Sequence, residues 1–575
     1  MSTSKVILFG LVAGTVLLPV AGSERSKGKV IIDQKVLTRL TEQLGDRSAI
    51  EPTYVGTEAC LACHQDKTDF RQGLHYSGLK MAKTDAYSMQ TKWGIIADYD
   101  RNGVDDFKQG LDFNKISSTF NQFKPNAPIL SYTAERGYVV TIAGVEYLVG
   151  FIHGGSGYYK QRFVLRFPVT DSASGFSADF YYSPLQFNEV SKSYVQYSTN
   201  YWYNSDNTPK ITGRMTAKQA AALGKSFNKD CAGCHSTNFV ALQDANGEWV
   251  TKVSSPVYTP PESPHWLDLD DNGWPEAYNI GCERCHGPGS RHIINLGDPW
   301  KVLNPGRDLT AKQNNELCGS CHSRGASIDG KHEYPMALDG ADYARNLGDD
   351  LWGKYLIDKP GLWPDGKTSK QHHQQMQDLM KSSKWEYENH KVTCNDCHDV
   401  HNAEPKHMRT KVEVDTTAGK LQIAVKVDDN TLCLACHAGF GPFASLKRED
   451  IANMDKNYGA VAAVVADHTK HPYNPTGKIG LSRCTSCHMP KMATSGDSYD
   501  ISSHTFEAVS PAKTLQYQDK GGMPNSCAGC HRPLAPLFGL PSDTSLTNWA
   551  EPADVELSKW LAQYYGPNGV WWQTK

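Results

Sequence analysis

The stretch that decides the fold is Cys282-Glu283-Arg284-Cys285-His286, two cysteines with two residues between them and a histidine directly after. The same Cys-x-x-Cys-His pattern occurs eight times in the 575-residue chain and uses all 16 cysteines. Two thiols at this spacing reach both vinyl groups of one haem, and the adjacent imidazole becomes the proximal ligand of the iron. The pattern therefore predicts eight covalently attached c-type haems.

Each motif supplies three predicted cofactor-binding residues. In chain order they are Cys60, Cys63 and His64; Cys231, Cys234 and His235; Cys282, Cys285 and His286; Cys318, Cys321 and His322; Cys394, Cys397 and His398; Cys433, Cys436 and His437; Cys484, Cys487 and His488; and Cys527, Cys530 and His531. Zinc ribbons and thioredoxin-like redox sites share the cysteine spacing, but neither requires a histidine after every second cysteine. Haem attachment is the interpretation that accounts for all eight.

The remaining histidines are candidates for the second axial ligand. A low-spin haem that carries electrons needs such a ligand, and neutral imidazole holds iron in both oxidation states. Of the 21 histidines in the chain, 13 lie outside the motifs. From their positions beside motifs and turns, the candidates are His75, His292, His390, His401, His504 and the two histidines of a His-Thr-Lys-His segment, His468 and His471. For each of them, a surface or hydrogen-bonded core histidine is the alternative.

The charge balance and the N-terminus limit the class of protein. With 59 basic and 62 acidic side chains the formal net charge is −3, which argues against a nucleic-acid binder. A basic residue at Lys5, an apolar run over 6–20 and small residues at 20–22 predict a signal peptide cleaved near Gly22. We expect an exported chain in the periplasm, at the cell surface or outside the cell, with no membrane span after cleavage.

The spacing of the motifs predicts the domain organisation. No cysteine occurs between residues 65 and 230, where strand-like runs cover 137–142, 145–149, 161–165 and 178–182. We expect a signal peptide over 1–22, an N-terminal segment with the first motif over 23–84, and a β-rich insert over 85–225. A multihaem core with seven motifs follows over 226–535, and a tail over 536–575. The predicted fold class is a mixed, mostly irregular and α multihaem cytochrome fold organised around eight haems, with a small antiparallel insert.

Three local elements are predicted within this frame. Short helices are expected over 216–223 and 371–382. Residues 411–414 and 421–427 bracket a Thr-Thr-Ala-Gly turn and are typical of a surface hairpin.

Two acidic loops predict a second kind of site. The first supplies Asp98, Asp100, Asn102 and Asp106, and the second supplies Asp268, Asp270, Asn272 and Glu276. Short oxygen side chains that alternate around a glycine are how a loop wraps calcium. Both loops depart from a full EF-hand at the twelfth position, which holds Gln109 and Asn279. Calcium binding is the hypothesis, and simple Asx turns are the alternative.

Several runs resemble a known family. Residues 280–292, 392–401, 484–490 and 524–527 look like the multihaem c-type cytochromes of the cytochrome c554 and hydroxylamine oxidoreductase-like superfamily. The resemblance covers roughly residues 54–533 and implies stacked and T-shaped haem pairs in a helical and coil framework. It supports His292, His390 and His401 as distal ligands most strongly, then His75, His468 and His504, and it adds His373.

The resemblance leaves the function divided between two main classes. The favoured one is an exported electron conduit that delivers electrons to a protein or to an extracellular acceptor such as a metal oxide, either alone or as a homo-oligomer or filament. The alternative is an oxidoreductase that acts on a nitrogen or sulfur oxyanion, or on hydroxylamine, at one open haem. Catalytic residues are not assigned, and a haem-bearing sensor or scaffold is a third class.

Overall fold

The computed structural model describes residues 52–82, 95–116, 118–155, 159–256, 266–270, 272–295, 297–382, 386–387, 390–426, 429–473, 482–495, 499–532, 549–565 and 569. The predicted signal peptide therefore lies outside the described residues. The chain divides into two compact units, one of Met1–Thr310 with Ser327–Tyr355 and one of Ala311–Ala326 with Leu356–Lys575. None of the helices among the described residues has the length and apolar character that a bilayer crossing needs.

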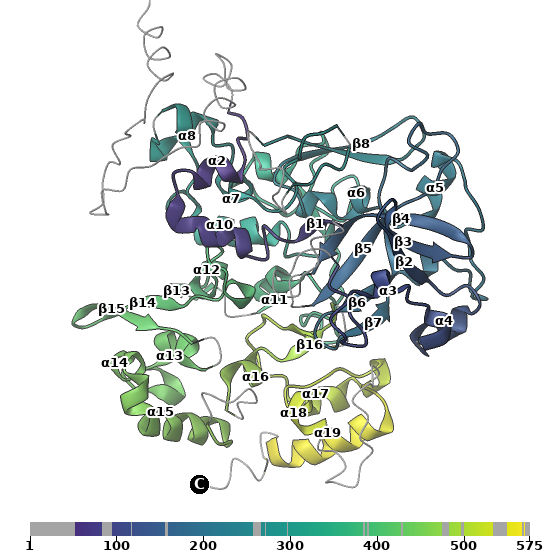
Figure 1. The fold of residues 1–575 in the computed structure, drawn as a ribbon. Helices are drawn as coiled ribbons and strands as arrows, with labels where there is room; N and C mark the ends of the chain where they lie inside the picture. The colour runs from purple at the N-terminus through teal and green to yellow at the C-terminus, as the bar shows by residue number, and fades with distance from the viewer. Residues whose placement is uncertain are drawn as a thin grey trace, which may run out of the picture. The chain divides into compact units, whose positions relative to one another are not determined.

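An antiparallel sheet of seven strands dominates the first unit (Figure 1). Its strands are β1 (Leu79–Met81), β2 (Ile129–Thr133), β3 (Gly137–Ile142), β4 (Val145–Gly154), β5 (Lys160–Arg166), β6 (Tyr181–Asn188) and β7 (Ser193–Gln196). The order is β2-β3-β4-β5-β6-β7, and β1 pairs with the second half of β4. This confirms the predicted antiparallel sheet after the first motif.

The last of the four predicted strands begins later in the structure than the sequence indicated. The predicted run was 178–182, whereas β6 begins at Tyr181. The backbone N–H of Ala178 donates instead to the Glu248 carboxylate at 3.0 Å, so this residue is held outside the ladder.

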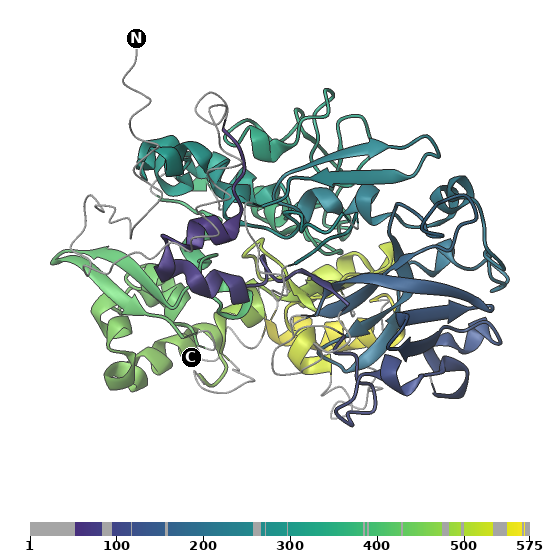
Figure 2. The ribbon, with the colours of Figure 1, turned by 45° about the horizontal axis from the view of Figure 1, so that its top comes forward.

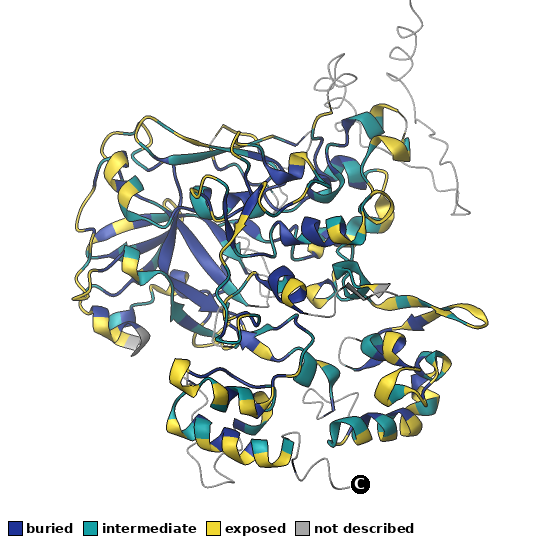
Figure 3. Ribbon diagram, turned by 180° about the vertical axis from the view of Figure 1, so that it is seen from behind, coloured by how far each residue is buried: buried dark blue, intermediate teal, exposed yellow. Residues whose placement is uncertain are grey.

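The two faces of the sheet bury different cores, because neighbouring residues of a strand point to opposite sides. Ile152, Phe163 and Tyr181 belong to an aromatic cluster with Phe107 and Trp202, and this cluster is the core of the insert itself. Their neighbours in sequence, Phe151, Val164 and Tyr182, pack with Phe227, Ala232 and Tyr278 around the second motif. The sheet therefore packs against the second cysteine motif on one face, and its central strands β5 and β6 are buried along most of their length, as the dark blue strands of Figure 3 show.

Short elements make up the rest of the first unit. They are α2 (Thr57–Leu61), η3 (Gln65–Gln72), α3 (Asp106–Gln109), α4 (Phe113–Ile116), η4 (Ser118–Phe123), η5 (Thr199–Tyr201), α5 (Ala217–Leu223), α6 (Phe227–Asp230), η6 (Ala232–Cys234), β8 (Phe239–Gln243), β9 (Trp249–Val253), α7 (Cys282–His286), α8 (Ser290–Ile294), η7 (Pro299–Lys301), α9 (Pro305–Asp308) and η8 (Tyr343–Arg345). Helix α5 agrees with the prediction, and Thr216 caps it by accepting the Gln219 N–H.

The second unit is built from short helices and small hairpins. They are α10 (Ala311–Gly319), β10 (Gly325–Ser327), β11 (Leu356–Asp358), α11 (Gln375–Lys381), β12 (Glu386–Tyr387), β13 (His390–Lys391), α12 (Cys394–Cys397), η9 (Pro405–His407), β14 (Lys411–Thr416), β15 (Gly419–Ala424), α13 (Thr431–His437), η10 (Gly441–Phe443), α14 (Arg448–Ala452), α15 (Met454–Thr469), α16 (Cys484–His488), β16 (Lys491–Ala493), β17 (Ile501–Ser502), α17 (Pro511–Gln516), η11 (Gln518–Lys520), α18 (Ala528–His531) and α19 (Pro552–Tyr565).

Two of these elements were predicted from the sequence. Strands β14 and β15 form the expected hairpin, drawn in green in Figure 2, with alternating exposure along both strands. Helix α11 starts at Gln375, four residues after the predicted start. The reason lies at His373, whose φ of 57° a right-handed helix cannot accommodate.

Candidate functional site

Four of the eight motifs have both cysteines inside one short helix: α7, α12, α13 and α16. The first cysteine of the motif opens α7, α12 and α16, at Cys282, Cys394 and Cys484. Residues three apart lie on the same face of a helix, so both thiols of such a motif point to one side. None of the 16 cysteines is in a disulfide.

Three pairs of histidines face each other at a nearly constant distance. The ring centroids are 6.1 Å apart for His64 and His292, 6.4 Å for His468 and His488, and 6.2 Å for His471 and His531. Two imidazoles on opposite sides of one metal have centroids about 6.3 Å apart, from a bond of about 2.0 Å and a nitrogen about 1.1 Å from each centroid. Each pair thus contains one motif histidine and one partner at the separation that axial ligation requires.

Hydrogen bonds fix the orientation of several motif histidines and candidate partners. In six histidines the Nδ1 atom lies within hydrogen-bond distance of a backbone carbonyl: His286 with Leu303 (2.8 Å), His292 with Asp298 (2.9 Å), His398 with Lys406 (2.9 Å), His471 with Thr469 (2.7 Å), His488 with Phe506 (3.2 Å) and His504 with Ser502 (3.1 Å). A protonated Nδ1 that donates to a carbonyl leaves the Nε2 lone pair for a metal. Five of these residues therefore fit a haem iron by donor type and by orientation, whereas the Nε2 of His471 lies 3.4 Å from Tyr565 Oη.

The other predicted distal ligands have different surroundings. His504 is half-buried, and its loss of hydration together with the charge of His398 lowers its pKa to about 4. His401 places Nδ1 3.2 Å from the Asp399 carboxylate, and the His373 ring meets the His372 ring edge-on at 4.5 Å. The His75 carbonyl accepts the Ile280 N–H. The side chain of His390 lies outside the described residues.

The sequence interpretation missed two histidines near the motifs and left a third, His471, out of the ligands that the resemblance supports. His471 faces His531. His407 is buried, with Nδ1 2.9 Å from the Asn402 carbonyl oxygen, and His153 lies 4.2 Å from His235 between ring centroids. His153 is in β4, and only the folded sheet brings it to the second motif.

Cysteines of different motifs lie side by side. Thiol hydrogen bonds join Cys60 with Cys282, Cys318 with Cys394, and Cys433 with Cys484. The bond lowers the pKa of the accepting Cys282, Cys394 and Cys484 thiols, because it stabilises the thiolate form.

Electrostatic interactions between thiols extend the series in the second unit. Cys397 interacts electrostatically with Cys433 and Cys436, and Cys487 does so with Cys530. The fourth to eighth motifs are therefore neighbours in the order of the sequence.

Two charged residues inside the third motif hold it to other parts of the first unit. The buried Glu283 carboxylate accepts the N–H groups of Val55, Gly56 and Gly289 at 2.7 to 3.1 Å. Burial raises the pKa of Glu283 to about 7, against the lowering effect of these donors. Next to it, buried Arg284 pairs with Asp342 at 2.9 Å.

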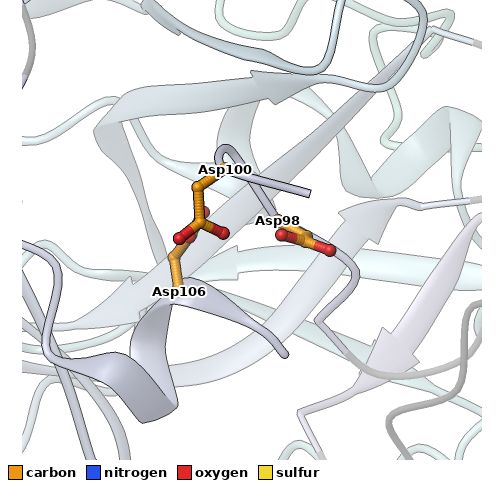
Figure 4. A group of neighbouring side chains, drawn as sticks. All are labelled: Asp98, Asp100 and Asp106. Carbon is orange, nitrogen blue, oxygen red and sulfur yellow. The ribbon is translucent and has the colours of Figure 1, made fainter. Parts of the chain in front are cut away.

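The two acidic loops have the same local structure. In the first, the Asp98 carboxylate accepts from Asn102 N and Gly103 N, and in the second the Asp268 carboxylate accepts from Asn272 N and Gly273 N. Carboxylate oxygens of Asp98, Asp100 and Asp106 lie within 4.8 Å of one another, as do those of Asp268, Asp270 and Glu276. Figure 4 shows the first group, with Asp106 at the start of α3.

Asp106 is the most unusual member of the first group. The residue is buried, its Oδ2 accepts from Tyr194 Oη at 2.7 Å and from Tyr99 N at 2.9 Å, and its buried Oδ1 accepts no hydrogen bond from the described residues. Burial raises the pKa of Asp106 to about 6, and the charges of Asp98 and Asp100 add to the rise. The group thus concentrates negative charge around an oxygen that lacks a donor.

Comparisons with known proteins identify similar multihaem proteins. No family model matches the chain. The chain is 26% identical over 175 residues to "Multiheme cytochrome MtrA" of Shewanella baltica (strain OS185), a match over 30% of this chain and 45% of that protein, less than half its length. Among solved structures, the outer cell wall cytochrome OcwA aligns with a TM-score of 0.42 at 21% identity over 83% of both chains. The undecaheme cytochrome from the S-layer of Carboxydothermus ferrireducens aligns with a TM-score of 0.33 at 16% identity, over 88% of this chain and 59% of that one.

The sequence match agrees with the motifs at a coarse level. That relative is by its name a multihaem cytochrome, which agrees with the interpretation of the Cys-x-x-Cys-His motifs as haem-attachment sites. The number of haems, the cytochrome c554 and hydroxylamine oxidoreductase-like superfamily, and the individual ligands stay predictions.

Proposed function

We propose that the chain is an exported octahaem c-type cytochrome that conducts electrons along mostly bis-histidine haems. The observation that carries the proposal is the separation of 6.1 to 6.4 Å between motif and partner imidazoles in three pairs. The sixteen motif cysteines would hold the haems, and His64, His488 and His531 would be proximal ligands opposite His292, His468 and His471. When bound, each haem supplies an iron that gains and loses one electron.

The neighbouring cysteines support a continuous path in the second unit. Once haem is attached, these sulfurs are thioethers at the edges of the haems, so adjacent cysteines indicate adjacent haem edges. Thiol hydrogen bonds join the fourth motif to the fifth and the sixth to the seventh, and electrostatic interactions between thiols connect the fifth to the sixth and the seventh to the eighth. In the first unit a thiol hydrogen bond joins the first motif to the third.

The remaining ligand assignments follow from the sequence and are part of the same proposal. His504 has its Nδ1 next to a carbonyl and lies beside His398, which supports a role as a distal ligand in the second unit. His75, His373, His390 and His401 complete the proposed set. The partners are redox proteins or an extracellular acceptor, and the location is the periplasm, the cell surface or the medium.

Spectroscopy of the holoprotein tests this proposal and separates it from the alternative. We expect haem quantitation to give eight haems per chain and EPR of the oxidised protein to give low-spin signals that do not change on addition of nitrite, hydroxylamine or sulfite. A single high-spin haem that shifts with one of these ligands contradicts the conduit and favours an oxidoreductase with an open haem.

We further propose that the two acidic loops bind calcium. The argument rests on the first loop, where carboxylate oxygens of Asp98, Asp100 and Asp106 lie within 4.8 Å of one another and the buried Oδ1 of Asp106 accepts no hydrogen bond from the described residues. A calcium ion takes six to eight oxygen ligands, and carboxylates and backbone carbonyls are its usual partners. The second loop repeats the hydrogen bonds of the first with Glu276 in place of Asp106.

Equilibrium dialysis with radioactive calcium tests the loops, because haem absorbance does not interfere with it. We expect a dissociation constant of about 10⁻⁴ to 10⁻³ M, as in extracellular modules. Asp100→Asn keeps an acceptor for the Asn102 N–H and removes one charge, so it should remove one bound calcium per chain. Asp206→Asn is the matched control, because Asp206 caps Thr208 in the same way outside both loops. Equal calcium binding by wild type and Asp100→Asn would sink the assignment.

A further inference from the structure

The same hydrogen bond joins three pairs of motifs. In each pair, the side chain three residues before the first cysteine of one motif accepts the backbone N–H of the first cysteine of the other. The bonds run from Cys282 N to Thr57 Oγ1 (3.2 Å), from Cys394 N to Asn315 Oδ1 (2.9 Å) and from Cys484 N to Asn430 Oδ1 (3.0 Å). We call this contact the cross-motif clip.

The clip has a simple physical cause. Cys282, Cys394 and Cys484 are the first residues of α7, α12 and α16, and the first N–H groups of a helix have no acceptor inside the helix. The acceptors Thr57, Asn315 and Asn430 are at most 5% exposed, so water does not take their place. A buried N–H without an acceptor is costly, and the side chain from the other motif removes that cost.

The two asparagines hold their partner motifs at two points. Asn315 Nδ2 donates to the Val392 carbonyl at 2.9 Å, and Asn430 Nδ2 donates to the Ser482 carbonyl at 2.8 Å. Each carbonyl lies two residues before the cysteine whose N–H the same asparagine accepts, so both ends of the amide are used and the register is fixed. Thr57 accepts the Cys282 N–H but has no amide donor for a backbone carbonyl of that motif. A Cβ at Gly281 would lie 2.5 Å from the Thr57 Oγ1, which explains the glycine there.

Asparagine also stands three residues before the second and third motifs, but there it holds strands. Asn228 Nδ2 donates to the Trp249 carbonyl of β9 at 2.9 Å. Asn279 pairs with both backbone groups of Leu79 in β1, at 2.6 and 3.1 Å. The clip is therefore specific to the pairs formed by the first and third, fourth and fifth, and sixth and seventh motifs.

We propose that Thr57, Asn315 and Asn430 are positioning residues that set the spacing and register of three haem pairs. The motifs that share a clip are the same ones whose first cysteines are joined by thiol hydrogen bonds. These sulfurs become thioethers without a proton when haem is attached, so the clip is the hydrogen bond that still joins each pair in the holoprotein. The proposal rests on the proposed function, because the paired motifs are taken to carry haems.

EPR of the oxidised holoprotein tests the clip, since the signals of neighbouring irons depend on their separation and orientation. Asn430→Ala removes both bonds to the seventh motif. We expect the variant to keep the wild-type haem content and to show changed signals for two haems per chain, with the other signals as in wild type. The matched control is Asn228→Ala, an asparagine at the same place in its motif and equally buried, and it should leave those two signals unchanged.

A milder variant covers the case in which Asn430→Ala does not fold. Asn430→Thr keeps a hydroxyl acceptor for Cys484 N, as Thr57 does in the first clip, and removes the donor to Ser482 without adding a charge, so the same two signals should change to a smaller extent. Wild-type EPR spectra from Asn430→Thr or Asn430→Ala, at full haem content, overturn the clip. A wild-type chain that attaches no haem refutes the proposed function instead. In that case hydrogen exchange tests the clip, because the Cys484 amide should lose protection at least tenfold in Asn430→Ala. Equal protection of this amide in wild type and variant overturns the clip.

Discussion

Replacing His292 by alanine should convert one haem of the chain to the high-spin state. The His64 and His292 ring centroids are 6.1 Å apart, which leaves about 3.05 Å on each side of a central metal. Subtracting about 1.1 Å from centroid to nitrogen gives a bond of about 2.0 Å, the length of a metal–imidazole bond. An alanine methyl group has no donor atom and cannot reach across this gap, so the iron opposite His64 loses its sixth ligand.

The magnitude follows from the count of motifs. One iron of eight changes its ligands, so about an eighth of the low-spin EPR intensity should disappear and one equivalent of a high-spin signal should appear. The assay is spin quantitation of the oxidised holoprotein at equal haem content. The substitution leaves His64 and its two cysteines in place, so the haem should stay attached.

His332→Ala is the control for a buried histidine that is not a ligand. His332 lies between Trp249 and Tyr334, with ring centroids at 4.6 and 4.8 Å, and its Nδ1 is 2.9 Å from the Lys229 carbonyl oxygen. Its removal should cost about 1 to 3 kcal/mol of stability, in the usual range for a buried polar side chain, without a spin change. If His292→Ala keeps the wild-type low-spin intensity, the assignment from the 6.1 Å separation is refuted.

Three further predictions concern two buried aspartates and one candidate iron ligand. Asp342→Asn should destabilise the first unit by about 2 to 4 kcal/mol in denaturant unfolding, because Arg284 stays buried without its anionic partner; a loss below 1 kcal/mol contradicts this. Burial raises the pKa of Asp179 from 3.8 to about 8, so its side chain favours the folded protein over the unfolded chain most strongly below pH 4. This contribution of Asp179 declines as the pH rises towards 8, by at most about 1.4 kcal/mol per pH unit. Asp179→Asn should therefore flatten the pH dependence of thermal unfolding. His471→Ala should produce a high-spin haem at the last motif, measured by EPR, whereas an unchanged spectrum means that His531 has a different partner.

Much of the cofactor chemistry could be predicted from the sequence, because covalent haem attachment uses a local pattern. Both cysteines and the proximal histidine of a motif lie within five residues, and no tertiary contact is needed to recognise them. The strands over 137–142, 145–149 and 161–165 were also local, since alternating and β-branched residues indicate a strand directly. The acidic loops were found for the same reason, and their carboxylates do converge.

The tertiary structure decided which histidine faces which motif. His292 stands six residues after His286 in sequence, yet its ring faces His64, 228 residues earlier. His471 and His468 share one segment, but they face His531 and His488. The sequence around a histidine does not indicate which motif its ring approaches, because the orientation of the ring depends on the turn that holds its Nδ1 and on the packing of the helices around it.

The asparagines before the motifs show the same division. The sequence by itself determined that Asn228, Asn279, Asn315 and Asn430 each stand three residues before a motif. Only the folded chain decided that the first two hold strands β9 and β1 while the last two hold the next motif. A primary amide can satisfy any exposed pair of backbone N–H and C=O groups, so its partner is whichever backbone the fold leaves unpaired beside it.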